Sequence, residues 1–298
     1  MWEKIAENKR NTWILIIVFS IFVLILSWFF GIVLGSGVLG LIIGLIFLIF
    51  YTIINYFIGA NIVLAISGAR EVKKEEEPYL FNIIEGLSIA AGIPKPKAYI
   101  IEDEAMNAFA TGRDPQHGVV VVTRGLLKRM NRQEIEGVIA HEIAHIQNYD
   151  IRLMLFAAVF VGATVLISDL LLRTIIFGGN RNRELGRAGI ILIIIGIILA
   201  LISPIIATII KLAISRQREF LADATGALLT RNPEGLASAL EKIGKDTNTL
   251  RTANEATAHL YFDNPLKNRG SIISFFDKMF LTHPPIEERI TRLRNLTK

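Results

Sequence analysis

The chain has 298 residues, 52% of them hydrophobic, and a mean hydropathy of +0.48, which is too high for an ordinary soluble protein. Its net charge of +5 comes from basic residues that are scattered or lie beside apolar runs, which favours a membrane flank over a nucleic-acid surface. The absence of cysteine excludes disulfides and thiolate metal ligands, and it is in keeping with a reducing compartment.

Residues 1–66 predict a membrane-spanning hairpin. No Asp, Glu, Lys or Arg lies between Arg10 and Arg70. A helix rises about 1.5 Å per residue and needs about 20 residues to cross the hydrocarbon layer, so this stretch is too long for one span. Glycines within 31–40 interrupt it, which predicts spans at 13–30 and 38–58, the second able to continue toward residue 66. A cleaved signal peptide is the alternative, but the apolar region is too long and no clear cleavage site follows.

The polar segment 67–152 predicts the first part of a catalytic domain that contains short strands. Residues 98–101, 108–111 and 118–123 have the composition of strands, most clearly at the valines 119–122. Residues 118–123 are a candidate for an exposed strand that holds an extended peptide by backbone pairing. The sequence favours an ordinary core strand somewhat more.

A predicted helix over 133–148 carries the strongest chemical signal. Asn131 is placed to cap it, and Glu134 completes the capping-box spacing. The motif H-E-I-A-H at 141–145 sets His141 and His145 one turn apart on one face, where both imidazoles can reach one metal. Zinc suits this pair, and Glu142 lies beside the first ligand, where it can act as general base. A helix with two structural histidines is the alternative.

Two later apolar segments predict a second hairpin over residues 153–210. Residues 153–172 are apolar except for Asp169, and residues 188–210 carry no charge. A pair of buried core helices is the alternative. The motif R-E-F-L-A-D follows, in the second part of the domain at 211–298. There Glu219 can supply a third zinc ligand, and Asp223, one turn on, can hydrogen-bond the far nitrogen of a ligand histidine. A hairpin that returns to its starting side brings these residues to the histidines.

The basic residues that flank the apolar segments predict the orientation. With the N-terminus inside, ten flank the inner side and four the outer side, so we expect a multi-pass protein of the plasma (inner) membrane with its catalytic domain in the cytoplasm. The inner residues are Lys4, Lys9, Arg10, Arg70, Lys73, Lys74, Arg152, Lys211, Arg216 and Arg218; the outer residues are Arg173, Arg181, Arg183 and Arg187.

These blocks, in this order, resemble the HtpX-type membrane-bound zinc metalloendopeptidases of peptidase family M48. The resemblance rests on the hairpin, M-N-A-F-A-T-G at 106–112, H-E-I-A-H, R-E-F-L-A-D and T-H-P-P at 282–285, and it covers nearly the whole chain. It implies an α-helical membrane protein with four transmembrane helices in two hairpins and an α+β, gluzincin-like protease domain. It also implies one Zn²⁺ per chain and quality-control cleavage of membrane proteins. By the match, Asn107 and His283 lie in the site as contacts to the substrate or transition state.

Three functions compete. The first is an endopeptidase that cuts misfolded or damaged membrane proteins or unfolded polypeptides at the lipid bilayer. The second is a specific processing protease of membrane or lipidated substrates, which four spans favour less because they leave little room for an enclosed lipid chamber. The third is a transporter or scaffold with a structural zinc, but transporters place functional groups at mid-membrane, whereas this motif lies on a polar helix. We expect no nucleic-acid partner, and no feature of the sequence indicates an oligomeric state.

Overall fold

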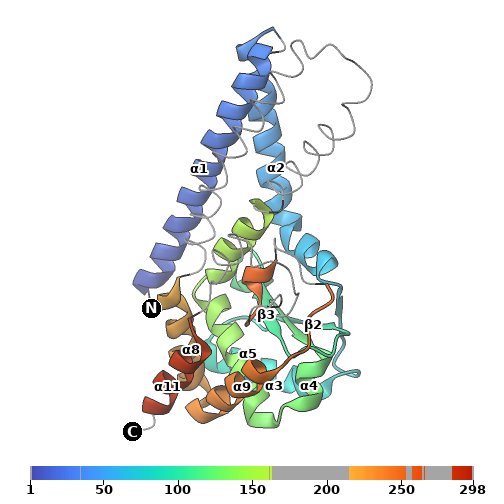
Figure 1. The fold of residues 1–298 in the computed structure, drawn as a ribbon, viewed down its shortest axis with the longest axis vertical. Helices are drawn as coiled ribbons and strands as arrows, with labels where there is room; N and C mark the ends of the chain where they lie inside the picture. The colour runs from blue at the N-terminus through green and yellow to red at the C-terminus, as the bar shows by residue number, and fades with distance from the viewer. Residues whose placement is uncertain are drawn as a thin grey trace.

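The computed structural model describes residues 2–33, 35–160, 162, 215–252, 257–263, 265 and 284–296. Most of the expected second hairpin, from residue 163 onward, and His283 lie outside the described residues. The described part is a mixed body of helices and one sheet, from which a long helical hairpin projects at one end (Figure 1).

The projecting hairpin consists of α1 (Trp2–Val33) and α2 (Gly37–Ile66). Ser36 caps α2 by accepting a hydrogen bond from Leu39 N at 3.3 Å. The two helices approach closely at glycine, because any Cβ on Gly40 would collide with the carbonyl oxygen of Ser27. Both helices are long and apolar enough to cross a membrane, and their large apolar side chains are exposed on the outside. The expected pair of apolar helices is therefore confirmed.

A four-stranded sheet lies in the body, in the order β1-β2-β4-β3. Its strands are β1 (Ala69–Glu71), β2 (Lys97–Ile101), β3 (Ala108–Thr111) and β4 (Val119–Thr123). Strand β4 pairs in parallel with β2 and antiparallel with β3, and all its residues are buried. The segment 118–123 is therefore a core strand, which is the interpretation that the sequence favours. It is not an exposed strand for a substrate, because both of its edges are already paired.

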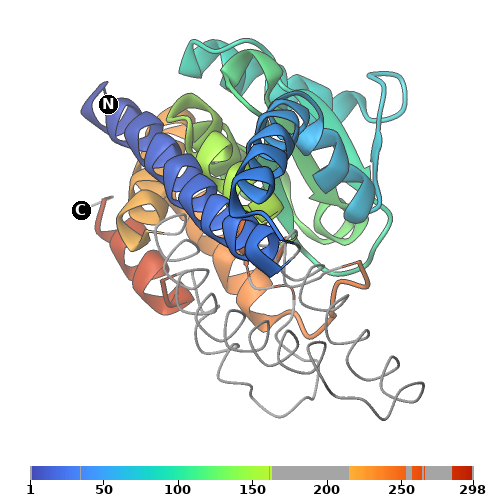
Figure 2. The ribbon, with the colours of Figure 1, turned by 90° about the horizontal axis from the view of Figure 1, so that it is seen from above.

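Helices pack around this sheet with α5 at the centre (Figures 1 and 2). Helix α5 contacts β3, β4, α3, α8 and α9, and its predicted apolar face is buried at Ile135, Val138, Ile139 and Ile143. Full burial of such side chains stabilises a fold by roughly 1.5–3 kcal/mol each, so α5 is held firmly. The helices are α3 (Pro78–Ala91), α4 (Arg124–Arg129), α5 (Arg132–Gln147), α8 (Arg216–Thr230), α9 (Pro233–Lys245) and α11 (Ile286–Asn295), with single turns at Pro115–His117 and Ala258–Leu260.

A further helix covers residues 150–160, at the start of the expected second hairpin. It packs against α1 and α2: the ring of Phe160 stacks on Phe19 with centroids 3.9 Å apart, and Leu153 and Phe156 join the same apolar cluster as Leu15. This packing fastens the N-terminal hairpin to the chain immediately after α5.

Candidate metal centre

Local hydrogen bonds fix the start of α5. The Asn131 side chain accepts from Glu134 N at 3.0 Å, and the Glu134 carboxylate accepts from Asn131 N at 2.8 Å, which is the predicted capping box. The same carboxylate accepts from Lys242 Nζ and Ser238 Oγ of α9, both at 2.7 Å. These bonds set the register of α5 and so the face on which its histidines lie.

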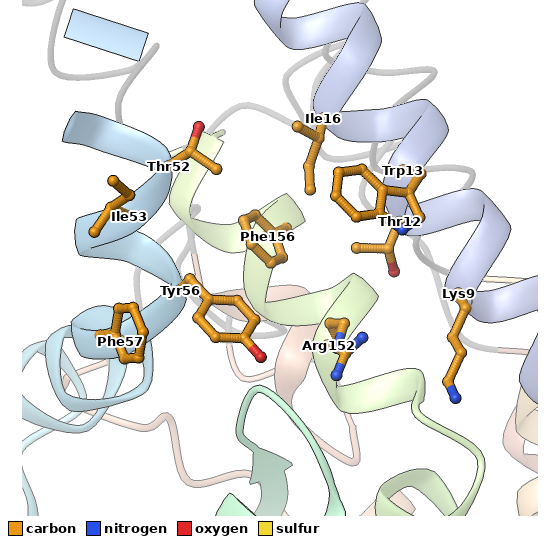
Figure 3. Close-up of a pocket in the computed structure, with 10 residues that line it drawn as sticks. All are labelled: Lys9, Thr12, Trp13, Ile16, Thr52, Ile53, Tyr56, Phe57, Arg152 and Phe156. Atoms are coloured by element: carbon orange, nitrogen blue, oxygen red, sulfur yellow. The ribbon is translucent and has the colours of Figure 1, made fainter. Parts of the chain in front are cut away.

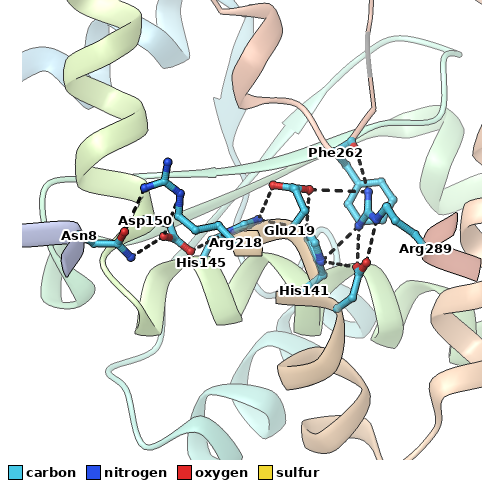
Figure 4. A network of polar contacts seen from close by, with 9 residues as sticks. Asn8, His141, His145, Asp150, Arg218, Glu219, Phe262 and Arg289 are labelled. Carbon is cyan, nitrogen blue, oxygen red and sulfur yellow. Dashed lines mark hydrogen bonds and ion pairs between the residues drawn. The ribbon is translucent and has the colours of Figure 1, made fainter. Parts of the chain in front are cut away.

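Three buried donors converge between α5 and α8: His141, His145 and Glu219 (Figure 4). The two Nε2 atoms lie 3.1 Å apart, and the Glu219 oxygens lie 3.7 Å from His141 Nε2 and 3.6 Å from His145 Nε2. Two tetrahedral zinc ligands are about 3.3 Å apart, so these donors fit one zinc ion. Helix α8 reaches α5 because Gly226 has no side chain; a Cβ there would lie 3.1 Å from His141 N.

Each imidazole has a carboxylate at its other nitrogen. Asp223 Oδ1 lies 2.9 Å from His141 Nδ1, and Asp150 Oδ2 lies 2.9 Å from His145 Nδ1. Such a carboxylate holds the Nδ1 proton, which turns the lone pair of Nε2 toward the metal. The structure thus places Asp223 where it can hold the tautomer of His141, and it adds Asp150 as the corresponding group for His145.

A buried arginine supports the first of these carboxylates. Arg289 of α11 donates to both oxygens of Asp223, at 2.8 and 2.7 Å, and its Nη1 lies 3.7 Å from Glu219 Oε2. Burial alone would raise the pKa of Asp223, but the charge and hydrogen bonds of Arg289 outweigh it and lower this pKa to about 2. Asp223 therefore stays ionised and remains an acceptor for His141.

The charges around the histidines favour a bound cation. Burial opposes a charge on His145, yet its hydrogen bond to Asp150 and the negative charges of Glu219 and Glu142 raise its pKa to about 9. Burial lowers the pKa of His141 to about 4. The same negative charges would also stabilise a divalent cation at Nε2, in place of the second proton of the charged imidazole, while Asp150 keeps the proton on Nδ1.

Helix α1 reaches this centre through Asn8, which is buried (Figure 4). Its Nδ2 donates to Asp150 Oδ1 at 2.6 Å and to the carbonyl oxygen of Asn148 at 2.9 Å. Its Oδ1 accepts from Arg218 Nη1 at 3.1 Å. One oxygen of Asp150 is thus held by the N-terminal helix while the other faces His145.

We expect Asn8→Ala to weaken metal binding by about tenfold without unfolding the hairpin. The change leaves Asp150 without its donor from α1, and loss of an outer-shell partner typically lowers metal affinity roughly 10- to 100-fold. Competition with a chelator measures this affinity on purified protein. Asn11→Ala, one turn further on the same helix, is the matched control and should bind metal normally. Equal affinity of both variants would remove Asn8 from the support of the metal centre.

Asn107 lies directly before β3, where its side chain holds a neighbouring segment. Its Nδ2 donates to Asp263 O at 2.9 Å, and its Oδ1 accepts from Ala108 N at 3.0 Å. Phe262 N donates to Ala108 O at 2.8 Å, and the Phe262 ring meets His141 edge-on, with centroids 4.9 Å apart. In this arrangement Asn107 braces the segment that covers His141.

Sequence reasoning missed four residues of this centre: Asn8, Asp150, Arg218 and Arg289. An acid five residues after His145 and an arginine directly before Glu219 are signals that could have indicated Asp150 and Arg218. Asn8 and Arg289 lie near opposite ends of the chain, and no spacing links them to the histidines.

Comparison with known proteins provides a second, independent line of evidence about this chain. A family model described as Peptidase family M48 matches residues 74–297. A protein named Protease HtpX homolog from Dictyoglomus thermophilum is 49% identical over 98% of this chain and 94% of its own length. Proteins of the same name from Thermoanaerobacter pseudethanolicus and Listeria monocytogenes are 48% and 43% identical, over 100% and 99% of this chain and 98% and 100% of their own lengths.

Among solved structures, S. mikatae Ste24p aligns with a TM-score of 0.49 and 20% identity, over 83% of this chain and 57% of that one. The family model covers most of the chain, and the HtpX homologues match nearly all of it. This chain, with its two membrane-capable helices, therefore belongs to peptidase family M48 and is a membrane metalloprotease.

Proposed function

We propose that this metalloprotease is a zinc-dependent endopeptidase that cleaves misfolded or damaged membrane proteins. The observation that carries the proposal is the convergence of His141, His145 and Glu219, next to Glu142, in the domain that bears the membrane hairpin. The HtpX name of its relatives supports a role in quality control.

The proposed layout has four transmembrane helices in two hairpins, at 1–66 and 153–210. Residues 67–152 and 211–298 together form a gluzincin-like catalytic domain. The packing of residues 150–160 against α1 and α2 supports a second hairpin beside the first. The described contacts between α5 and α8 support a single domain built from both polar segments.

Each residue of the proposed site has a separate role in peptide hydrolysis. Bound zinc would lower the pKa of a water molecule and polarise the scissile carbonyl. Glu142 accepts the proton of the attacking water and delivers it to the leaving amine. Asp223 and Asp150 keep the two Nε2 lone pairs directed at one point, so that the site is preorganised.

The developing oxyanion needs a donor, and we propose His283 for this role from the T-H-P-P motif. Asn107 is the second proposed contact. Its amide is engaged with the backbone of Asp263, so direct contact with an oxyanion requires that bond to break. Its stronger contribution is to hold Phe262 over His141.

The test is cleavage of one membrane protein in a native and a destabilised form by the reconstituted full-length enzyme. We expect several cuts in the destabilised form, few in the native form, loss of cleavage with a zinc chelator and recovery with added Zn²⁺. A single cut at one site, shared by both forms, would indicate a specific processing protease instead. Cleavage that resists the chelator would refute the zinc mechanism.

We expect the catalytic domain to face the cytoplasm, as the asymmetry of basic residues predicts. The chain has no cysteine, so single cysteines report topology cleanly. A membrane-impermeant thiol reagent outside intact cells should label Ser36→Cys, at the tip of the hairpin, but not Lys128→Cys, at an exposed position of α4. In permeabilised cells, the reagent should label both variants. Labelling of Lys128→Cys in intact cells would indicate that the catalytic domain faces outward.

A further inference from the structure

A cleft of about 220 Å³ opens where the hairpin meets the catalytic domain. It lies between α1, α2 and the helix at residues 150–160, with Phe156 at its back (Figure 3). Its walls are mostly apolar, including Ile16 of α1 and Ile53 of α2, whereas Lys9 and Arg152 line its opposite end. The cleft therefore changes from apolar to cationic along its length.

Both cations lie against the same aromatic ring, that of Tyr149. Lys9 Nζ lies 4.3 Å from the centroid of the Tyr149 ring, and Arg152 Cζ lies 5.1 Å from the same centroid. Among the described residues neither forms an ion pair with a carboxylate, and Arg152 Nε donates a hydrogen bond to the carbonyl oxygen of Arg113. The nearby Asp150 is buried and engaged with Asn8. Two like charges near one ring repel each other, and a phosphate bound at this end of the cleft would offset that repulsion.

The cationic end lies at the expected edge of the bilayer. Lys9 and Arg10 are the last charged residues before the uncharged stretch, and Trp13, which also lines the cleft, is 64% exposed. Lys and Arg at this depth direct their charges to the headgroup layer, while aromatic residues occupy the interface. The cationic end has the chemistry to hold a phosphate, and the apolar walls can contact the first part of an acyl chain.

We propose that this cleft binds one anionic phospholipid, with its phosphate against Lys9 and Arg152 and its acyl chain between α1 and α2. A basic residue near a membrane surface favours an anionic lipid by about 1 kcal/mol, or about fivefold, so two such cations select it over a zwitterionic lipid. The site is separate from the metal centre, and the proposal does not depend on the proteolytic activity.

The fluorescence of Trp13, which lines the cleft, can report a lipid bound there. In the full-length protein, Trp2→Phe and Trp28→Phe leave Trp13 as the one tryptophan. The protein is reconstituted in phosphatidylcholine vesicles that contain a small, equal fraction of brominated phosphatidylglycerol or brominated phosphatidylcholine. We expect the brominated phosphatidylglycerol to quench the fluorescence of Trp13 with an apparent affinity at least about fivefold higher than that of the brominated phosphatidylcholine. A reporter with Trp28 alone, at the far end of α1, should show no such preference.

Substitutions decide whether the cleft causes the preference. Lys9→Gln with Arg152→Gln should abolish it, and Thr52→Phe, which fills the cleft without changing charge, should reduce it. Arg10→Gln removes a positive charge from the next residue, which lies outside the cleft, and this variant should retain the lipid preference. The double variant Lys9→Arg with Arg152→Lys keeps both charges and should retain the preference too. Unchanged quenching by brominated phosphatidylcholine shows that the hairpin is intact. Equal quenching by the two lipids, or a preference that survives the double Gln variant, would overturn the proposal.

Discussion

Replacing Glu142 with Gln is expected to abolish peptide cleavage while metal binding is retained. Gln has the size and shape of Glu, and position 142 is not among the three converging donors. The amide cannot accept a proton from the attacking water or pass one to the leaving amine. General acid–base catalysis contributes roughly 10²- to 10⁴-fold, so the turnover number should fall by at least that range.

The measurement pairs the metal content of the purified variant with its turnover of a membrane-protein substrate. Glu136→Gln is the matched control: Glu136 lies on the same helix, but its carboxylate pairs with Arg132 on the surface. That variant should keep full activity. Activity of Glu142→Gln close to that of the parent protein would remove Glu142 from the mechanism. Loss of metal together with activity would instead make Glu142 a structural support of the site.

The sequence predicts the local part of the metal centre well, because its signals are short in range. The cap at Asn131, the apolar face of α5 and the spacing of His141 and His145 all follow from one helix and its period. Glu219 is harder to predict as a ligand, because its helix, α8, is distant in sequence from α5. A motif next to an apolar segment identified it as a candidate, and the packing of α5 on α8 supplies the proximity.

The missed supports depend on tertiary packing that no local period encodes. Asn8 is a polar residue near the start of an apolar helix, and only the docking of α1 beside Asp150 gives it a partner. Arg289 belongs to a charged, amphipathic helix, and a solvent-exposed arginine would be the ordinary expectation there. Strand β4 shows the same limit, because four consecutive valines predict a strand but not whether its edges are free.

These long-range contacts join both terminal helices to the candidate metal centre. Asp150 is held by α1, and Asp223 is held by α11. Each carboxylate faces a different histidine of α5. We therefore expect a change near either terminus to act on one of the two histidines, and the metal affinity, rather than the fold alone, should report it.

Replacing Glu219 with Ala is expected to remove tight zinc binding and, with it, activity. Only two protein donors, His141 and His145, then remain, whereas catalytic zinc sites usually have three. Loss of an outer-shell partner already costs roughly 10- to 100-fold in affinity, so loss of a direct ligand should exceed about 100-fold. The buried Arg289 also loses a carboxylate 3.7 Å away, which adds a cost in folding stability.

A second variant separates these two effects. Glu219→Gln keeps the volume of the side chain and leaves a neutral oxygen near Arg289, so it should fold better than Glu219→Ala while still binding zinc weakly. Gln217→Ala, on the exposed side of the same helix, should bind zinc normally. Zinc content after dialysis against a chelator, together with the thermal unfolding midpoint, measures both effects. If Glu219→Ala keeps one tightly bound zinc per chain and full activity, the third ligand is another residue. Asp223 would then be the first candidate, although it would have to release His141 and Arg289 to reach the metal.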